Sequence, residues 1–313
     1  MVNLNLANPE KSNIKYKIVS YPDGQQDIIL KPFFYKRFLH GYTLATEKEK
    51  TFTVENGQIE IQSRFSSFKD LELIVCATKA LRNVGIKEIS LYIPYLLGAR
   101  ADRKFQDGGT SYLVDVVAPI INSLGFEYVK VLDVHSDVAA ACIKHLVNFD
   151  NYKLVEFTLN RLYPNLLRTN EEYTLISPDA GSLKKINKIA YQIEYKNDII
   201  CCSKHRDAEG KLTKTFVPLT AKNLNKDFII IDDICDGGNT FINITKEIKK
   251  WDTTNSCKIY LIVTHGIFSQ GFLKLGEYFD GIFCTNSYKD INTESLSAVA
   301  SYENKTFKQL NIF

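Results

Sequence analysis

The residues best suited to chemistry lie in the stretch 227–250. An apolar run, 228–231, ends at two adjacent carboxylates, Asp232 and Asp233, and after a glycine-containing loop apolar residues recur at helical spacing. This pattern predicts a strand, a loop and a helix. The loop residues are Asp236, Gly237, Gly238, Asn239 and Thr240. Glycines let the backbone approach a ligand, helix-start N–H groups favour an anion, and carboxylates can hold sugar hydroxyls or magnesium. The stretch therefore offers one place for a phosphate and one for a polyol or a metal.

Charged residues also follow a second predicted strand. The loop 98–104, GARADRK, places Arg100, Arg103 and Lys104 around Asp102. Guanidinium groups match phosphate oxygens in bidentate fashion, so such a loop suits a polyphosphate. A solvated charged loop without a ligand is the other interpretation, and the residues alone leave both open.

Two single residues stand at the ends of further predicted strands. His135 ends the run LDVH, and Asp179 lies in SPDAG, a strand-to-helix turn whose carboxylate would face the same edge of the sheet. Each residue type can bind a metal ion. A strand-end histidine is also a common structural hydrogen-bonding group, and proline, aspartate and glycine together are a common turn.

The segment 203–214 is rich in cations and poor in apolar residues. Its positive or titratable side chains surround a glycine and are Lys204, His205, Arg206, Lys211 and Lys214. This composition predicts an exposed, mobile loop. The loop is either a solvated hairpin or a lid whose cations close over a transferring phosphoryl group.

The composition is that of an ordinary globular protein. The 313 residues are 45% hydrophobic and 24% charged, which suits two mid-sized domains better than one large one. The formal net charge of +3 is small for this length, so nucleic acid and acidic membrane surfaces are not expected partners. The seven cysteines include no CxxC pair, which argues against a zinc site or a disulfide framework. With no apolar signal core and no run long enough to span a membrane, a cytoplasmic protein is expected.

The elements that must position these residues alternate between strand and helix, which predicts an α/β fold. Helices are expected at 68–82 and at 111–124, where Pro119 is an awkward interior residue. An N-terminal hairpin is expected around the turn YPDGQ, residues 21–25. The main predicted strands are 58–62, 88–93, 128–132, 173–176, 198–201, 228–231, 259–263 and 281–284. Counting these units places a domain boundary near residue 156.

The order and spacing of the motifs resemble those of the ribose-phosphate diphosphokinases, the phosphoribosyl pyrophosphate synthetases. The resemblance runs from about residue 16 to 287 and rests on YPDGQ, GARADRK, LDVHSD, SPDAG, SKHR, IIIDDICDGGNT and THGIFS. SPDAG and THGIFS stand as that family writes them. The resemblance implies two tandem phosphoribosyltransferase-type domains, each a mostly parallel sheet flanked by helices. Residues 1–156 would form the ATP-side domain, and 157–313 the ribose-phosphate-binding domain.

The resemblance also implies a reaction and the residues that serve it. The β,γ-diphosphate of ATP, with Mg²⁺ as cofactor, would pass to the anomeric hydroxyl of ribose 5-phosphate and leave AMP. Matching the motifs by position, Lys204 and Arg206 would be catalytic, and His135 and Asp179 would bind the metal. The ATP site would comprise Tyr21, Asp23, Gln25, Arg100, Asp102, Arg103 and His135. The ribose-phosphate site would comprise Asp232, Asp233, Asp236, Gly237, Gly238, Asn239 and Thr240.

Several residues depart from the family pattern. Ala101 stands where the family usually has glutamine, Phe105 where it has a charged residue and Gln25 where it has glutamate, so altered ATP recognition is expected. In the loop DGGNT, Gly237 removes a hydroxyl donor and Asn239 replaces a glycine. A phosphodiester carries one charge fewer than a terminal phosphate and bears a bulky substituent, for which Gly237 could make room.

Four functions therefore stay under consideration. The first is diphosphate transfer to ribose 5-phosphate in nucleotide biosynthesis. The second is the same transfer to a ribose with a larger group at O5, such as ADP-ribose, in NAD metabolism. A phosphoribosyltransferase would share the acidic pair but would not explain GARADRK, SPDAG and THGIFS, and a regulatory subunit typically lacks lid or metal residues that are present here. Family members form dimers and hexamers in which the YPDGQ hairpin completes a neighbour's ATP site, so a homo-oligomer is expected.

Overall fold

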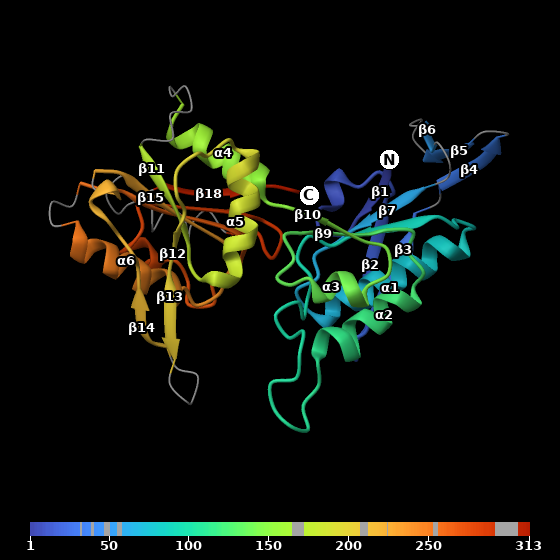
Figure 1. Ribbon diagram of the computed structural model, residues 1–313. Coiled ribbons are helices and arrows are strands. Elements are labelled where there is room, and N and C mark those ends of the chain that lie inside the picture. The colour runs from blue at the N-terminus through green and yellow to red at the C-terminus, as the bar shows by residue number, and fades with distance from the viewer. Residues whose placement is uncertain are drawn as a thin grey trace. The chain divides into compact units, whose positions relative to one another are not determined.

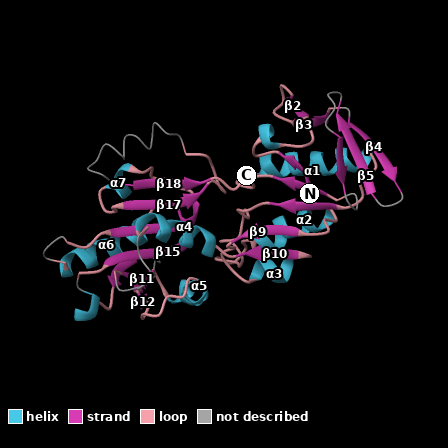
Figure 2. Ribbon diagram, turned by 90° about the horizontal axis from the view of Figure 1, so that it is seen from above, coloured by secondary structure: helices cyan, strands magenta, loops and turns pink. Residues whose placement is uncertain are grey.

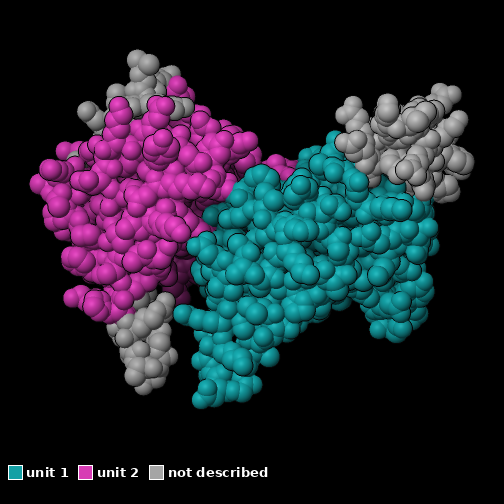
Figure 3. Space-filling view, turned by 45° about the vertical axis from the view of Figure 1, so that its right-hand side comes forward, with its two compact units in different colours: residues 1–149, 313 teal, residues 150–312 magenta. Residues whose placement is uncertain are grey.

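The computed structural model spans residues 1–313 and is shown in Figure 1. The structure describes residues 1–31, 33–38, 41–46, 51–54, 58–164, 172–206, 212–223, 225–252, 256–291 and 306–313. Of these, the side chains of 33–38, 41–46, 51–54, 206, 212–213 and 273 are not described. The chain divides into two compact units, unit 1 being Met1–Phe149 with Phe313 and unit 2 being Asp150–Ile312 (Figure 3). No helix within the described ranges is long and apolar enough to cross a lipid bilayer.

A five-stranded parallel sheet with the order β1-β7-β8-β9-β10 forms the centre of unit 1. The strands are β1 (Val2–Asn5), β7 (Ile59–Gln62), β8 (Ile89–Tyr92), β9 (Val129–Leu132) and β10 (Leu146–Phe149). The helical elements are η1 (Pro9–Lys11), α1 (Phe68–Asn83), α2 (Ala118–Ser123) and α3 (Val138–Cys142). Buried side chains such as Ile61, Leu91 and Ile74 join these strands and helices in one core.

Pro119 explains why the helix predicted at 111–124 is not a single regular helix. A π-helical segment, η3 (Tyr112–Val117), comes first, and Pro119 then lies in the first turn of α2. Proline lacks the N–H that a helix interior needs, but it is tolerated in the first turn. The expected helix is therefore corrected to two segments.

Two antiparallel pieces belong to unit 1 as well. β2 (Tyr16–Ser20) and β3 (Gln26–Leu30) form the hairpin predicted around YPDGQ, and Gly24 has a φ of +90° in its turn. A three-stranded sheet of β4 (Phe33–Phe38), β5 (Gly41–Thr46) and β6 (Thr51–Val54) was not predicted. β4 mixes aromatic and charged residues without alternation, whereas β5 and β6 are short but do alternate polar with apolar residues.

Unit 2 is built on a six-stranded parallel sheet with the order β12-β11-β15-β16-β17-β18. The strands are β11 (Tyr173–Ser177), β12 (Ile200–Cys201), β15 (Asp227–Cys235), β16 (Ile259–Gly266), β17 (Gly281–Thr285) and β18 (Thr306–Leu310). The helical elements are α4 (Tyr152–Leu162), α5 (Ala180–Gln192), η4 (Ala221–Asn223), α6 (Asn239–Trp251) and α7 (Leu273–Gly276). A separate antiparallel pair joins β13 (Ser203–Arg206) to β14 (Leu212–Phe216).

Both faces of this sheet are buried, which explains the near-continuous apolar runs in its strands. Phe228 and Ile230 of β15 belong to the core that contains α6, whereas Ile229 and Ile231 belong to the core that contains α4 and α5. Figure 2 shows the strands side by side with helices next to them. The predicted α/β class with mostly parallel sheets is confirmed.

The expected domain boundary at residue 156 falls inside α4. Leu154 and Val155 of this helix are buried with Ile186 and Ile189 of α5 in one core of unit 2. The two compact units divide earlier, between Phe149 and Asp150. A helix that buries a continuous face in a single core stays whole, so the division precedes α4.

Candidate active site

Asp232 and Asp233 lie inside β15 rather than after it. The strand continues from its apolar run through both carboxylates to Cys235, and Asp232 pairs with Val263 of β16. The prediction that the strand ends at Ile231 is therefore corrected. Continued ladder pairing with β16 supplies the backbone hydrogen bonds that extend it.

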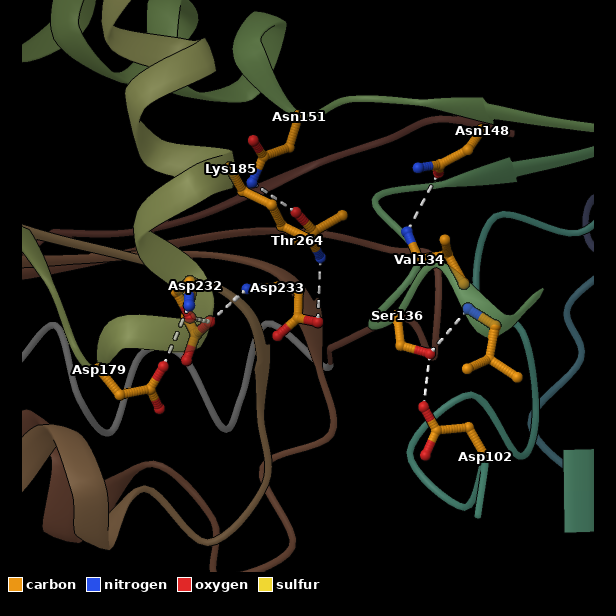
Figure 4. Close-up of polar contacts among 12 residues, drawn as sticks. Asp102, Val134, Ser136, Asn148, Asn151, Asp179, Lys185, Asp232, Asp233 and Thr264 are labelled. Carbon is orange, nitrogen blue, oxygen red and sulfur yellow. Dashed lines mark hydrogen bonds and ion pairs between the residues drawn. The ribbon is translucent and has the colours of Figure 1, made fainter. Parts of the chain in front are cut away.

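Helix α5 contacts both carboxylates of this acidic pair (Figure 4). The Ser182 hydroxyl donates to Asp232 Oδ1 at 2.8 Å, and the Lys185 ammonium lies 3.3 Å from Asp233 Oδ2. The same Asp232 Oδ1 accepts the backbone N–H of Asp233 at 3.0 Å. Burial first, and then the charge of Asp233, raise the pKa of Asp232 well above its ordinary value, although the Ser182 hydrogen bond acts in the opposite direction.

Asp179 connects two loops that the sequence presents as separate motifs. It is the N-cap of α5, where Oδ1 accepts the N–H of Ser182 at 3.1 Å, and its Oδ2 lies 2.7 Å from the Lys204 ammonium in β13. Burial by itself would raise the pKa of Asp179, but the hydrogen bond and charge of Lys204 outweigh it, so the pKa is lowered. A predicted metal ligand and a predicted catalytic lysine are thus ion-paired.

The carboxylates of unit 2 are the oxygen donors that magnesium prefers. In the described parts of the chain, no three His, Cys, Asp or Glu side chains form a group that could hold a metal ion by themselves. Magnesium usually keeps several waters and takes only one or two carboxylates besides substrate phosphates, and Asp179 or the acidic pair fits that mode. His135, the other predicted ligand, belongs to unit 1.

The loop after β15 starts helix α6 and contacts the segment that follows β16. Gly238 is the N-cap of α6, with a φ of +79°. A Cβ added to Gly237 would meet nothing closer than Gln270 Cγ at 3.5 Å. The Lys274 ammonium donates to Asn239 Oδ1 at 3.3 Å. The N–H groups at the start of α6, at the positive end of its dipole, together with this cation favour an anion.

In unit 1 a hydrogen bond joins two loops that were predicted to bind ATP. The Ser136 hydroxyl donates to Asp102 Oδ2 at 2.5 Å and accepts a backbone N–H of α3 at 3.3 Å (Figure 4). Asp102 belongs to the GARADRK loop, and His135 directly precedes Ser136. The Arg103 guanidinium lies 5.6 Å from the centroid of the Phe105 ring. Asp102 is therefore held next to the loop that carries His135.

The remaining predicted ATP residues lie in the turn of the β2–β3 hairpin. Tyr21, Asp23 and Gln25 are all exposed. The turn is closed by hydrogen bonds from the Tyr21 N–H to the Gln25 carbonyl at 2.9 Å and from the Gln25 N–H to Asp23 Oδ1 at 3.2 Å. These bonds keep the turn compact while leaving its side chains open to solvent.

Known proteins similar to this chain identify its family. The family model described as phosphoribosyl transferase domain matches residues 147–267. A ribose-phosphate pyrophosphokinase of Mycoplasmopsis pulmonis is 25% identical over 255 residues, covering 80% of this chain and 74% of the relative. A ribose-phosphate pyrophosphokinase of Mycoplasma genitalium is 27% identical over 269 residues, covering 83% of this chain and 74% of the relative. These comparisons support the ribose-phosphate pyrophosphokinase family for this chain.

The pyrophosphokinase fold agrees with a solved structure. The crystal structure of phosphoribosylpyrophosphate synthetase from Mycobacterium smegmatis matches with a TM-score of 0.64 at 17% identity, covering 91% of this chain and 87% of that chain. The predicted fold of two phosphoribosyltransferase-type domains is therefore confirmed. The predicted family is confirmed too, and with it the enzyme class that the family name states.

The structure brings together part of the expected pyrophosphokinase site. Within unit 2 it links Asp179 to Lys204, and it links both carboxylates of the acidic pair to α5. Arg206 ends β13, but its side chain is outside the described residues. Lys211 belongs to the range 207–211, which is also outside them. The roles of these residues stay predictions.

Four polar side chains beside the pyrophosphokinase loops were not predicted from the sequence: Ser182, Lys185, Gln270 and Lys274. Ser182 and Lys185 follow Asp179 at intervals of three, and this spacing puts residues on one helix face, so it could have identified them. Gln270 and Lys274 follow THGIFS, and nothing in the sequence indicates that they reach the loop before α6.

Replacing Gly238 by alanine is expected to destabilise unit 2 by roughly 1–3 kcal/mol. A Cβ here would lie 2.6 Å from Cδ2 of buried Leu275, and an L residue at a φ of +79° is strained. Thermal unfolding should show Tm lowered by about 2–4 °C for each kcal/mol lost. Gly237→Ala is the matched control, since its Cβ meets only ordinary contacts, and an equal Tm for the two variants would contradict the argument.

Proposed function

We propose that this chain transfers the β,γ-diphosphate of ATP to the anomeric hydroxyl of ribose 5-phosphate, giving phosphoribosyl pyrophosphate and AMP. The ion pair of Lys204 with Asp179, whose neighbour Ser182 on α5 donates a hydrogen bond to Asp232, is the observation that carries the proposal. It puts a cation that can neutralise phosphate oxygens beside carboxylates that can hold a sugar. The similarity to ribose-phosphate pyrophosphokinases supports the same reaction.

The residues proposed to bind the acceptor belong to unit 2. Asp232 and Asp233 would hold the 2- and 3-hydroxyls of the ribose, and the loop 236–240 with the first N–H groups of α6 would receive the 5-phosphate. A sugar held at both ends presents its C1 hydroxyl in a defined direction. The C1 oxygen would bond to the β-phosphorus of ATP while the bond from that phosphorus to the α,β-bridging oxygen breaks and AMP leaves.

Lys204 would neutralise charge on the transferring diphosphate. In the structure its side chain is only 13% exposed, and its ammonium is ion-paired with Asp179. Diphosphate oxygens would compete with the Asp179 carboxylate for this cation, and Arg206 of the same strand would add a second one. Magnesium held by Asp179 or the acidic pair supplies further positive charge to the phosphate oxygens when it is bound.

The residues proposed to bind ATP belong to unit 1. Arg100, Arg103, Asp102 and His135 would bind ATP, and the Ser136–Asp102 hydrogen bond supports a common site because it joins the loops that carry them. The hairpin turn with Tyr21, Asp23 and Gln25 would complete the ATP site of a neighbouring subunit. A dimer or hexamer is therefore part of the proposal.

A second candidate function is the same transfer to a ribose with a larger group at O5, such as the terminal ribose of ADP-ribose. The missing side chain at Gly237 favours it, since the volume that a Cβ would fill there is free up to an ordinary contact with Gln270 Cγ at 3.5 Å. The exposed Lys274, bound to Asn239, places a further cation at the edge of the loop. A second phosphate on the acceptor would find its counter-charge there.

Offering ribose 5-phosphate and ADP-ribose in competition, with ATP and magnesium, is expected to separate the two candidates. Mass spectrometry of the products should show AMP together with one diphosphorylated acceptor. AMP should form only when an acceptor is present, because the C1 hydroxyl is the nucleophile. Folded protein that forms no AMP with either acceptor would favour the non-catalytic regulatory role instead.

A further inference from the structure

The N-cap of α5 and two polar residues within the helix are spaced three apart, and each contacts a residue of the proposed active site. The contacts are Asp179 with Lys204 at 2.7 Å, Ser182 with Asp232 at 2.8 Å and Lys185 with Asp233 at 3.3 Å. Residues three apart lie on one face of a helix, so α5 presents a continuous polar stripe to the site. Its apolar residues Ile186, Ile189 and Ala190 face the core of unit 2.

Strand geometry alone would separate the two carboxylates. Successive residues of a strand point to opposite faces of the sheet, as Ile230 and Ile231 do by entering different cores. By the same alternation, the side chains of Asp232 and Asp233 would diverge. β11 makes its last pairing with β15 between Ile176 and Ile230, and beyond that point α5 begins and reaches both carboxylates (Figure 4).

We propose that Ser182 and Lys185 are positioning residues that turn the carboxylates of Asp232 and Asp233 toward one acceptor ribose. The inference rests on the proposed function, in which these carboxylates bind the ribose hydroxyls. Lys185 also offsets the repulsion between two adjacent negative groups, of which the Asp233 side chain is only 6% exposed. Without α5 contacts on both, one carboxylate at most would meet the vicinal hydroxyls of a sugar.

Lys185→Met is expected to raise KM for the acceptor roughly 10- to 100-fold, because a carboxylate displaced by about 1 Å no longer aligns the sugar. The KM for ATP should change less than about twofold, since the proposed ATP residues lie elsewhere. Lys185→Arg retains the ion pair and should restore most of the acceptor affinity. Ser182→Ala should move the acceptor KM in the same direction by a smaller factor.

Lys188→Met is the matched control. Lys188 lies on the same helix and is ion-paired at 2.9 Å with Asp150, which has no place in the proposed site. The proposal would be overturned if Lys185→Met changed the KM for the acceptor and the KM for ATP equally. It would also be overturned if the acceptor KM of Lys185→Met equalled that of Lys188→Met. If Lys185→Met does not fold, Ser182→Ala and Lys185→Gln take its place in the same comparison.

Calorimetric titration without ATP separates this inference from the proposed reaction. Wild-type protein should bind ribose 5-phosphate or ADP-ribose, and Lys185→Met should bind the same compound roughly 10- to 100-fold more weakly. If the wild type binds the acceptor but forms no AMP, the proposed transfer is refuted. The positioning role is then still tested by the acceptor affinity of Lys185→Met. Wild-type protein that binds neither compound overturns both.

Discussion

Replacing Lys204 by alanine is expected to lower kcat for diphosphate transfer by about 10²–10³-fold. The Lys204 ammonium lies 2.7 Å from Asp179 and is the nearest described cation to a carboxylate that was predicted to bind metal. A positive group aimed at developing phosphate charge acts mainly in the transition state, so the KM for ATP should change far less than kcat. Steady-state kinetics of AMP release at saturating acceptor would measure both constants.

The matched control for this substitution is Lys222→Ala. Lys222 is an exposed lysine of η4 that takes no part in the proposed site, so its removal should leave kcat unchanged. If Lys204→Ala behaves like Lys222→Ala, Lys204 is not catalytic. Losses of equal size in kcat and in ATP affinity would instead indicate that Lys204 binds ATP before transfer rather than acting during it.

Lys204→Ala should also change the acid stability of the protein. Burial alone would raise the pKa of Asp179, but the hydrogen bond and charge of Lys204, together with the backbone N–H groups of Ser182 and Gly181, lower it. A carboxyl with a lowered folded-state pKa stabilises the protein above its unfolded pKa, and this contribution is lost as pH falls through the folded pKa. The Tm difference between wild type and variant should therefore be present at pH 7 and shrink below about pH 4.

Replacing Asp232 by asparagine is expected to abolish transfer, with a loss of about 10³-fold or more, yet raise Tm by about 2–4 °C. Activity falls because an amide cannot supply the carboxylate charge that the ribose hydroxyls or a metal require. Stability rises because burial and the charge of Asp233 disfavour the ionised form of Asp232, whereas an asparagine Oδ1 can still accept the Ser182 hydroxyl. Calorimetric unfolding and an AMP assay measure the two effects.

The Tm gain of Asp232→Asn over the wild type is expected to depend on pH. The folded-state pKa of Asp232 is raised. Between the unfolded-state pKa and the folded-state pKa, the native protein therefore binds more protons than the unfolded chain, and the stability of the native protein falls as pH rises through this range. The Tm advantage of Asp232→Asn should therefore shrink as pH falls and wild-type Asp232 takes up its proton. Asp233→Asn is the contrasting variant, because it loses the ion pair with Lys185 and should lower Tm. Equal Tm changes in the two asparagine variants would contradict this account.

The central strands of both parallel sheets were predictable because burial on both faces produces continuous apolar runs, whereas the edge strands β1, β10 and β18 were not predicted. The runs expected at 128–132, 173–176 and 281–284 correspond to β9, β11 and β17 with bounds that differ by one residue at most. Where a strand contains polar residues, the predicted strand ended too early. β15 continues through Asp232 and Asp233 because β16 pairs with its backbone, and backbone pairing does not depend on apolar side chains.

Residue types at the candidate site were predictable from motif spacing, but their partners were not. Ser182 contacts Asp232 across 50 residues of sequence, and Lys185 contacts Asp233 across 48. Both contacts exist because β11 and β15 are neighbours in the sheet although β12, β13 and β14 lie between them in the chain. Such non-local pairing follows from the packing of whole elements, and no local pattern encodes it.

The sequence by itself determined the alternation of strands and helices, the family motifs and the carboxylates, glycines and lysines of the proposed site, because periodicity and spacing are local properties of a chain. Only the tertiary structure decided that Asp179 holds Lys204, and that α5 contacts both carboxylates of the acidic pair. The physical reason is that these contacts join residues far apart in the chain, which meet only when whole strands and helices pack against one another.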